Sequence, residues 1–422
     1  MAGLLRQYTP AYVAGHRRQA APQVQSTLAK LSLCRTAALG GRRYRCGSCD
    51  RECTVYNSCG DRHFPQCSGA KRADWMTSAA QLLLPGIDYF QVVFTIPDQL
   101  SSLALGNRRE IYDLLFRSAW RALREVIEEE QAFEASAVMV LHTWNQKLEP
   151  HAHVHAIVPG GGPSLTGERR WVPAQRRGRS SRHRRRRRSR PRGNRPYLVA
   201  ADELRQRFRK VFLDGLRRLH RKRCLKLDGD WSHLRNRSAF ETWLKPLEHV
   251  TWVTYIEPPP SENSSPEHVL KYLARYLTGG PISDRRLISH QRGGVTFRAR
   301  TGTTPGGGHA ETQAYTLSET EFVRRWSLHI LPKGYVKTRR FGGYSNRHRK
   351  RYIAECRDLL LADSVDPLDD PSNPCESPAS ELTDERRCPK CGELMRCIAT
   401  TDRSSWSVVM SGPTRPIWYD DG

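Results

Sequence analysis

The chain has 422 residues, and 69 Lys and Arg against 43 Asp and Glu give it a formal charge of +26. This length predicts two or three domains, and so large a positive charge predicts a polyanionic partner, most simply nucleic acid. The sequence lacks any run of about 18 apolar residues, which argues against a membrane-spanning helix, and its first residues lack the apolar core of a secretory signal. We therefore expect a cytoplasmic protein whose 12 cysteines serve as thiolate ligands rather than disulfides.

A cysteine cluster follows a weakly helical stretch at residues 8–33. A Cys-x-x-Cys knuckle precedes a Cys-x-x-x-His-x-x-x-Cys segment, which places five soft or borderline ligands within 22 residues. Tetrahedral zinc needs four such ligands, and a segment with so little apolar material has few other ways to fold. Arginines in the same segment favour DNA binding. We predict a zinc site with ligands among Cys46, Cys49, Cys59, His63 and Cys67, and with Cys34 or Cys53 as further candidates; unliganded reduced cysteines are the alternative.

Two strands and a helix are predicted next. Residues 89–96 are β-branched and aromatic and stop at Pro97. Residues 107–131 carry apolar side chains at helical spacing, and residues 137–144 have the composition of a second strand.

A histidine-rich strand is predicted at residues 148–162, where an apolar, β-branched middle runs into a proline and three glycines. Alternate side chains of a strand share a face, so His151, His153 and His155 point one way while Val154 points into a core. Two neutral imidazoles at this spacing can chelate a divalent cation, whereas the alternative is a half-buried strand that is merely rich in histidine. Antiparallel pairing with residues 137–144 would bring His142 and Asn145 near the histidine face.

An arginine-rich insertion occupies residues 174–196, which contain almost nothing that could build a core. We predict that it is disordered when free, and that it acts as a linker and as a sequence-independent phosphate clamp. Its DNA-binding candidates are Arg184, Arg185, Arg186 and Arg187. A basic amphipathic helix at residues 201–223 and a strand at residues 249–256 are predicted to follow.

A capped helix is predicted at residues 264–280, because start signals precede it and two glycines end it. Tyr272 and Tyr276 are four residues apart and so project from one face, with Lys271 and Arg275 beside them as candidate DNA contacts. Packing residues with solvated hydroxyls are the alternative interpretation of this tyrosine pair.

The remaining chain is predicted to form a hairpin at residues 286–300, a helix at residues 318–331, and a basic aromatic run at residues 333–344. In that run we expect Tyr335, Phe341 and Tyr344 to stack on bases while Arg339 and Arg340 follow the DNA backbone; an amphipathic sheet edge is the alternative. Residues 363–385 have linker composition. Cys388, Cys391 and Cys397 are similar to part of a zinc ribbon that lacks a fourth thiolate.

The histidine and tyrosine motifs together predict a reaction. A metal held by two strand histidines withdraws charge from a phosphodiester, while a tyrosine hydroxyl attacks phosphorus and forms a 5′-phosphotyrosine. That bond conserves energy for a second strand's 3′-hydroxyl, and two tyrosines on one helix face allow two successive transfers.

The order of motifs, from the zinc cysteines through Phe94-Thr-Ile-Pro97, Leu141-His-Thr-Trp144 and His151-Ala-His-Val-His155 to Tyr272-Leu-Ala-Arg-Tyr276, resembles the rolling-circle transposases of the IS91 family. These belong to the HUH (His-hydrophobe-His) endonuclease superfamily, and the resemblance spans residues 34–351. It implies an α+β fold with a ferredoxin-like antiparallel sheet, the HUH nuclease core, and an N-terminal zinc-binding module. The family usually has a cysteine where this chain has Phe64, so one zinc ligand is missing or is replaced by Cys53.

The resemblance also implies the site and its ligands. His153 and His155 would bind a catalytic Mg²⁺ or Mn²⁺ ion, Tyr272 and Tyr276 would be the catalytic nucleophiles, and the zinc would be structural. The third ligand of the catalytic ion stays open among His142, Asn145, Gln146 and His151. The expected partners are single-stranded DNA and element-end hairpins, near the bacterial nucleoid and without a membrane.

We therefore expect three regions: a zinc-binding, DNA-binding module at residues 1–80, an HUH-type catalytic domain at residues 85–355, and a linker and tail at residues 356–422. The predicted function is that of a DNA transposase that nicks and joins single-stranded DNA. One alternative is a catalytically inactive DNA- or RNA-binding protein derived from such a transposase. The other is a histidine-triad nucleotide hydrolase, which shares the local histidine pattern but needs neither a zinc module nor this charge.

Overall fold

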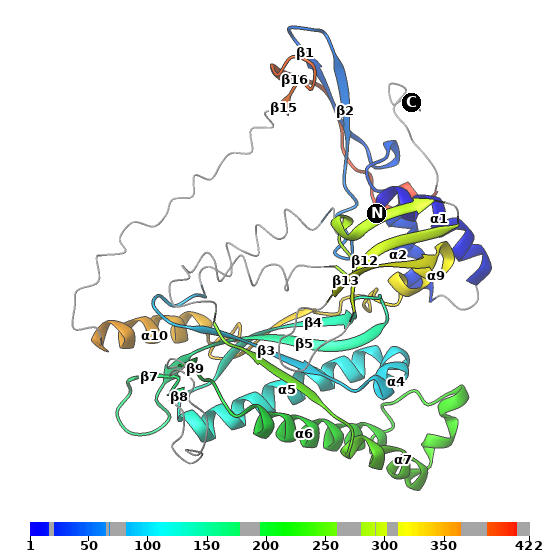
Figure 1. The fold of residues 1–422 in the computed structure, drawn as a ribbon. Coiled ribbons are helices and arrows are strands. Elements are labelled where there is room, and N and C mark those ends of the chain that lie inside the picture. Colours follow the sequence, from blue (N-terminus) through cyan, green and yellow to red (C-terminus); the bar gives the residue numbers. More distant parts are fainter. Residues whose placement is uncertain are drawn as a thin grey trace.

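A five-stranded antiparallel sheet forms the centre of the computed structural model, which describes residues 1–16, 21–64, 67, 82–177, 195–259, 280–291, 293–301, 311–363 and 386–411. Its strands lie in the order β10-β3-β5-β4-β14, and every neighbouring pair is antiparallel. The bounds are β3 Tyr89–Thr95, β4 Ser136–Trp144, β5 Pro150–Pro159, β10 Val253–Glu257 and β14 Thr338–Gly342. The predicted antiparallel pair of histidine strand and preceding strand is confirmed as β4 and β5 (Figure 1).

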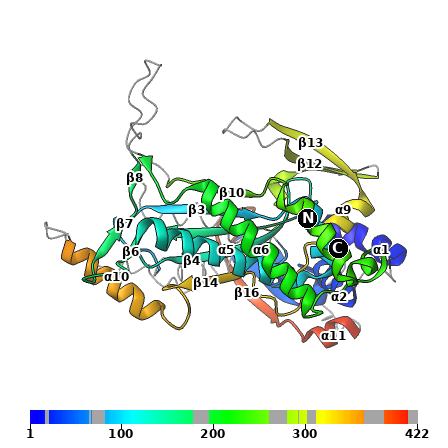
Figure 2. The same cartoon turned by 90° about the horizontal axis from the view of Figure 1, so that it is seen from below.

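Two long helices cover one face of this sheet, as Figure 2 shows from below. They are α5 Arg108–Gln131 and α6 Ala201–Arg221, which confirms the helices predicted at residues 107–131 and 201–223. The apolar stripe of α6 is buried against the sheet, where the rings of Phe94 and Phe208 are 5.1 Å apart. Val154 is fully buried in the same core, as the alternation of β5 predicts. Shorter helices, α4 Ser101–Gly106 and α7 Arg237–Leu244, flank this layer.

The opposite face of the sheet is partly covered by α10 Arg349–Asp363. Tyr344 and Tyr352 pack there with Val138 of β4 in a separate small core. The loop after β5 lies close to other backbone, which explains its glycines: a Cβ on Gly162 would lie 2.6 Å from the carbonyl oxygen of Glu134. Two-stranded pairs extend this end of the molecule, namely β6 Gly161–Pro163 with β7 Trp171–Pro173, and β8 Arg176–Arg177 with β9 Arg195–Pro196.

A second core joins the N-terminal helices to a three-stranded sheet from much later in the chain. The helices α1 Ala2–His16 and α2 Pro22–Ser32 pack with α9 Glu319–Ser327, and the sheet has the order β11-β12-β13. Its strands are β11 Leu287–Gln291, β12 Gly294–Thr301 and β13 Glu311–Ser318. The predicted hairpin at residues 286–300 is confirmed as β11 and β12, whereas β13 was not predicted. The N-terminal helices therefore share one core with the later chain.

A four-stranded sheet joins the two ends of the chain. Its order is β15-β16-β1-β2, with β1 Gly41–Cys46, β2 Glu52–Tyr56, β15 Arg386–Arg387 and β16 Leu394–Thr401. Figure 1 shows β15 and β16 beside the long β1–β2 hairpin, away from the central sheet. A short helix, α11 Trp406–Ser411, follows. The region predicted as a linker and tail with a partial zinc-ribbon motif, residues 356–422, thus contributes β16, whose backbone hydrogen-bonds to β1.

Several 3₁₀ turns complete the described chain: η1 Ala37–Leu39, η3 Asp98–Leu100, η5 Gly229–Arg235, η6 Lys245–Glu248 and η7 Asp284–Arg286. The strand predicted from residue 249 begins only at Val253, because the preceding turn is fixed by a hydrogen bond from Trp252 Nε1 to the carbonyl of Leu247 at 2.8 Å. Among the described residues, no helix combines the length and the apolar character needed to cross a membrane.

Candidate active site

Three histidines meet on the face of the central sheet that α5 and α6 leave uncovered. His142 of β4 lies directly opposite His153 of β5, and His155 is two residues farther along the same strand. The ring centroids of His142 and His155 are 4.6 Å apart, and those of His153 and His155 are 5.0 Å apart. One nitrogen of each ring lies within 4.8 Å of the other two, so the three imidazoles can share one metal ion.

The local environment keeps the imidazoles of His153 and His155 neutral. Burial lowers the pKa of His153 to about 3, with a further contribution from His155. Burial also lowers the pKa of His155 to about 4, and the positive charge of Lys337 adds to that effect. Because a neutral imidazole has a lone pair on one nitrogen, both side chains are in the protonation state that a metal ligand requires.

Hydrogen bonds at Nδ1 orient the rings of His153 and His155. Nδ1 of His153 donates to the carbonyl oxygen of His151 at 2.9 Å, which leaves Nε2 as the lone-pair nitrogen. Nδ1 of His155 lies 3.1 Å from the side-chain amide of Gln91, a buried residue of β3. Sequence reasoning missed Gln91 because the pairing of β3 with β5 brings it to this face. The His153 contact matches the way metal-binding histidines are held in proteins, in which the ring nitrogen away from the metal donates a hydrogen bond.

The other candidates for the third metal ligand have different partners. Nδ1 of His151 is 3.0 Å from a carboxylate oxygen of Asp98. The side-chain oxygen of Asn145 accepts hydrogen bonds from the backbone N–H groups of Lys147 and Glu149, both at 2.9 Å, and so fixes the turn between β4 and β5. Of the predicted alternatives, His142 is the one that the structure groups with His153 and His155.

A buried cation lies beside the histidines. Nζ of Lys337 is 5.3 Å from the ring centroid of Trp144, and burial lowers the pKa of Lys337 to about 8. Its positive charge lowers the pKa of His155, so the site combines the neutral imidazoles of His153 and His155 with a nearby positive charge. The sequence offered no specific signal for Lys337 within its strongly basic surroundings.

The cysteines form two clusters instead of the single predicted zinc site. Cys34, Cys59 and Cys67 lie together in the N-terminal core, with Sγ atoms of Cys34 and Cys67 3.3 Å apart. Cys46 and Cys49 belong to a second cluster with Cys388 and Cys391 from the tail. Among the described residues, Cys53 and Cys397 belong to neither cluster. The prediction of one site from Cys46 to Cys67 is therefore corrected, because the two halves of that motif fold apart.

His63 is not grouped with the thiols, contrary to the prediction. Its Nδ1 is 2.8 Å from a carboxylate oxygen of Asp61, and its Nε2 accepts a hydrogen bond from the backbone N–H of Leu331 at 3.1 Å. Both ring nitrogens are thus engaged within the protein. Phe64 is fully buried and belongs to the same core as Cys34, Cys59 and Cys67.

The basic aromatic run does not present its rings to a nucleic acid. Tyr335 and Tyr344 are each 1% exposed, and Phe341 stacks on Trp120 with centroids 5.4 Å apart. The prediction of base stacking is wrong for these rings, since the run forms the sheet edge β14 and turns its aromatic side chains inward.

The two arginines predicted as DNA contacts in this run also have protein partners. Arg339 forms an ion pair with Asp113 and lies over the ring of Phe116, 4.4 Å from its centroid. A guanidinium nitrogen of Arg340 lies 3.2 Å from the side-chain oxygen of Asn346. The remaining predicted residues, Lys271, Tyr272, Arg275, Tyr276, Arg184, Arg185, Arg186 and Arg187, lie outside the described residues.

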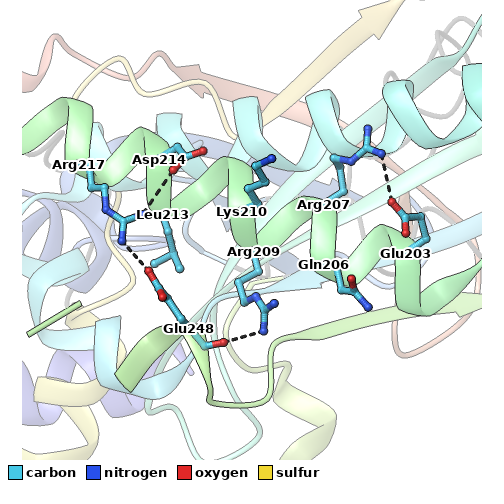
Figure 3. Close-up of a pocket in the computed structure, with 9 residues that line it drawn as sticks. All are labelled: Glu203, Gln206, Arg207, Arg209, Lys210, Leu213, Asp214, Arg217 and Glu248. Carbon is cyan, nitrogen blue, oxygen red and sulfur yellow. Dashed lines mark hydrogen bonds and ion pairs between the residues drawn. The ribbon is translucent and has the colours of Figure 1, made fainter. Parts of the chain in front are cut away.

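A surface pocket of about 450 Å³ lies on α6, which packs against the other face of the sheet (Figure 3). Arg207 in this pocket pairs with Glu129 at 2.9 Å and with Glu203 at 3.1 Å. Arg217 pairs with Glu248 at 2.6 Å. Carboxylates thus neutralise Arg207 and Arg217, whereas Arg209, which also lines the pocket, donates to the backbone carbonyl oxygen of Glu248 at 2.6 Å.

Comparison with known proteins identifies the family. A family model described as "Putative transposase" matches residues 136–351, and one described as "Transposase zinc-binding domain" matches residues 4–96. "Putative transposase y4qJ" of Sinorhizobium fredii is 35% identical over 399 residues, which cover 93% of this chain and 92% of that protein. "Transposase for insertion sequence element IS801" of Pseudomonas savastanoi pv. phaseolicola is 28% identical over 386 residues, which cover 87% of this chain and 82% of that protein.

No solved structure matches the chain. The first family model covers half of the chain and includes β4 and β5 with all three histidines, while the second includes the cysteines from Cys34 to Cys67. The sequence resemblance and these matches agree along nearly the whole length, and we conclude that the protein belongs to the transposases of the IS91 family.

Proposed function

We propose that this transposase nicks and joins single-stranded DNA at the ends of its insertion element by a rolling-circle route. The observation that carries the proposal is the group of three histidines, His142, His153 and His155, on one face of the central sheet, with His153 and His155 held neutral by burial. Such a group is suited to holding a divalent ion against a phosphodiester.

The connectivity of the central sheet supports an HUH nuclease core. Along the chain, β3, α5, β4, β5, α6 and β10 follow a β-α-β-β-α-β order, and the last strand lies beside the first. This is the order of a ferredoxin-like fold, to which β14 adds an edge strand. The histidine strand β5 then occupies the middle of the sheet, where both neighbours fix its position.

The catalytic ion in this proposal is Mg²⁺ or Mn²⁺, held by His142, His153 and His155. The donor set fits a divalent ion because each ring offers a nitrogen and burial keeps His153 and His155 neutral. Once bound, such an ion withdraws charge from the oxygens of the scissile phosphate. Lys337 beside the site adds a fixed positive charge that attracts the phosphate and opposes protonation of His155.

The nucleophile in this proposal is the hydroxyl of Tyr272 or Tyr276. Its oxygen loses a proton and bonds to phosphorus, the bond from phosphorus to the 3′-oxygen breaks, and the released strand ends in a 3′-hydroxyl. The result is a 5′-phosphotyrosine, which another 3′-hydroxyl displaces to restore the tyrosine and a phosphodiester. This role rests on the family resemblance and on the four-residue spacing, which would put both tyrosines on one face of the helix predicted from the sequence.

DNA binding is proposed to use cations near the tyrosines and in the insertion. Lys271 and Arg275 flank the tyrosine pair, and Arg184 to Arg187 form the densest run of positive charge. Contacts of this kind bind the phosphate backbone without reading sequence. The proposed partners are therefore single-stranded DNA and hairpins at the element ends.

A covalent-capture experiment tests the proposal. Purified protein, Mn²⁺ or Mg²⁺ and a labelled single-stranded oligonucleotide with candidate element ends are resolved on a denaturing gel. We expect a metal-dependent shifted band that is lost in the Tyr272→Phe, Tyr276→Phe double variant and in the His153→Ala, His155→Ala double variant. Tyr255→Phe is the matched control, because Tyr255 is 54% exposed on β10 and has no part in the proposed chemistry.

Two outcomes would contradict the proposal. A covalent band that persists in the double tyrosine variant would show that another residue is the nucleophile. Tight DNA binding without any adduct, on ends that a related active enzyme cleaves, would favour the inactive DNA-binding alternative.

A further inference from the structure

The second cysteine cluster has the dimensions of a tetrathiolate metal site. The Sγ atoms of Cys46 and Cys391 are 3.4 Å apart, those of Cys49 and Cys388 are 3.6 Å apart, and those of Cys49 and Cys391 are 3.7 Å apart. A zinc ion with Zn–S bonds of about 2.3 Å places tetrahedral sulfurs about 3.8 Å from one another. A disulfide would need about 2.05 Å. The spacing therefore suits four thiolates around one ion.

The two halves of the cluster have the same backbone construction. In the first, Cys46 N donates to Arg51 O at 2.9 Å and Asp50 N donates to Cys46 O at 3.0 Å. In the second, Cys388 N donates to Glu393 O at 2.7 Å and Gly392 N donates to Cys388 O at 2.9 Å. Both turns thus close by hydrogen bonds between residues five and four positions apart.

The two turns, after Cys46 and after Cys388, also share their backbone angles. The fourth residue after the first cysteine is left-handed in each turn, with φ of 53° at Asp50 and 78° at Gly392. Aspartate and glycine are among the residues that adopt this conformation most readily. Two unrelated segments with one hydrogen-bond pattern, each presenting two thiols, form a matched pair of Cys-x-x-Cys knuckles.

The surrounding sheet has little else to hold it together. Its apolar core consists of Tyr44, Cys46, Cys388 and Met395, with a few half-buried neighbours. So small a core contributes little stability by itself, and small domains of this kind depend on a metal or a disulfide. A bound ion would supply that stability at the point where β1 and β16 meet.

We propose that Cys46, Cys49, Cys388 and Cys391 bind one zinc ion that joins the C-terminal strand β16 to the N-terminal hairpin. The site is separate from the Cys34, Cys59 and Cys67 cluster. Two of its four ligands lie far outside residues 4–96, the region that matches a zinc-binding domain. The proposal does not depend on the DNA chemistry, since it concerns the closure of the chain on itself.

Zinc analysis of the full chain tests the proposal. We compare the wild type with a Cys46→Ser, Cys49→Ser variant, a Cys388→Ser, Cys391→Ser variant and the quadruple variant, and measure zinc per chain by mass spectrometry. Each double variant and the quadruple variant should lose the same single equivalent of zinc. Cys397→Ser is the matched control, because Cys397 lies in β16 but outside the cluster and should keep the wild-type content.

Losses that add in the quadruple variant would indicate two independent sites and overturn the proposal. Unchanged zinc in the Cys388→Ser, Cys391→Ser variant would overturn it as well.

A second measurement avoids substitutions that impair folding. Cysteine alkylation of the wild type is mapped by mass spectrometry before and after chelation. Cys46, Cys49, Cys388 and Cys391 should be protected together and become reactive together, whereas exposed Cys224 and Cys397 should react in both states. Reaction of Cys388 and Cys391 at the rate of Cys397 in the zinc-loaded protein would refute the shared site.

Discussion

The sharpest test of the histidine hairpin concerns His329, which lies just after α9 and is 3% exposed. Its Nε2 donates to the carbonyl of Leu148 at 3.1 Å, and its Nδ1 accepts from the hydroxyl of Thr143 at 3.1 Å. Thr143 lies near the end of β4, and Leu148 lies in the turn between β4 and β5. Burial lowers the pKa of His329 to about 4, so the neutral ring supports the hairpin that carries the metal-site histidines.

The lowered pKa of His329 makes the free energy of unfolding depend on pH. An unfolded histidine titrates near pH 6.5, so between about pH 4 and pH 6.5 the unfolded chain binds a proton that the native chain does not. Stability therefore falls as the pH falls through this window. One proton of difference is worth about 1.4 kcal/mol per pH unit, and integration from pH 7 to pH 5 gives a loss of about 2 kcal/mol from this residue.

The assay is urea unfolding followed by tryptophan fluorescence at pH 7, 6 and 5, on the wild type and on His329→Gln. The variant has no titrating group at this position, so the wild type should lose about 2 kcal/mol more than the variant between pH 7 and pH 5. His233→Gln is the control, because His233 is exposed in both states and its removal should leave the pH profile unchanged. Equal losses in the wild type and in His329→Gln would refute the claim that the fold holds this imidazole neutral.

Three further predictions concern packing and metal choice. Val154→Ala removes two methyl groups from a fully buried site and should lower the free energy of unfolding by about 2 kcal/mol, whereas Val253→Ala, at a residue 48% exposed, should change urea unfolding little. Gly343→Ala places a Cβ 2.2 Å from the ring of Tyr352 and should cost about 1–3 kcal/mol, seen as a lower Tm than that of Gly106→Ala, which meets no neighbour within 4 Å. Calorimetric titration should give tighter binding of Mn²⁺ or Co²⁺ than of Mg²⁺, because imidazole suits the softer ions; tighter Mg²⁺ binding would argue against a three-histidine site.

The parts of the fold that depend on local sequence were predictable. Helix α5 begins within one residue of its predicted start, because its apolar spacing is regular over 24 residues. The pairing of β4 with β5 followed from two adjacent strand patterns joined by a short turn. The register that sets His142 opposite His153 was not predictable from the residues, because strand pairing alone leaves the register open.

The cysteine assignments failed for a different reason. Spacing along the chain suggested that Cys46 and Cys49 share an ion with Cys59 and Cys67. Their partners are instead far away in the sequence, with a separation of 339 residues from Cys49 to Cys388. Short motifs identify the type of ligand but carry no information on which motifs meet in space. In the same way, the aromatic residues near Tyr335 suggested stacking because composition alone does not reveal that β14 turns them inward.

The pairing of β1 with β16 has a consequence during synthesis. Gly41 leaves the ribosome 360 residues before its partner Thr401, a delay of about 20–70 s at 5–20 residues per second. Throughout that time one edge of β1 is open, and open strand edges invite aggregation. A transposase gene interrupted before residue 386 would encode a protein without β16. The edge of β1, the first strand to be synthesised, would then stay uncovered and open to aggregation.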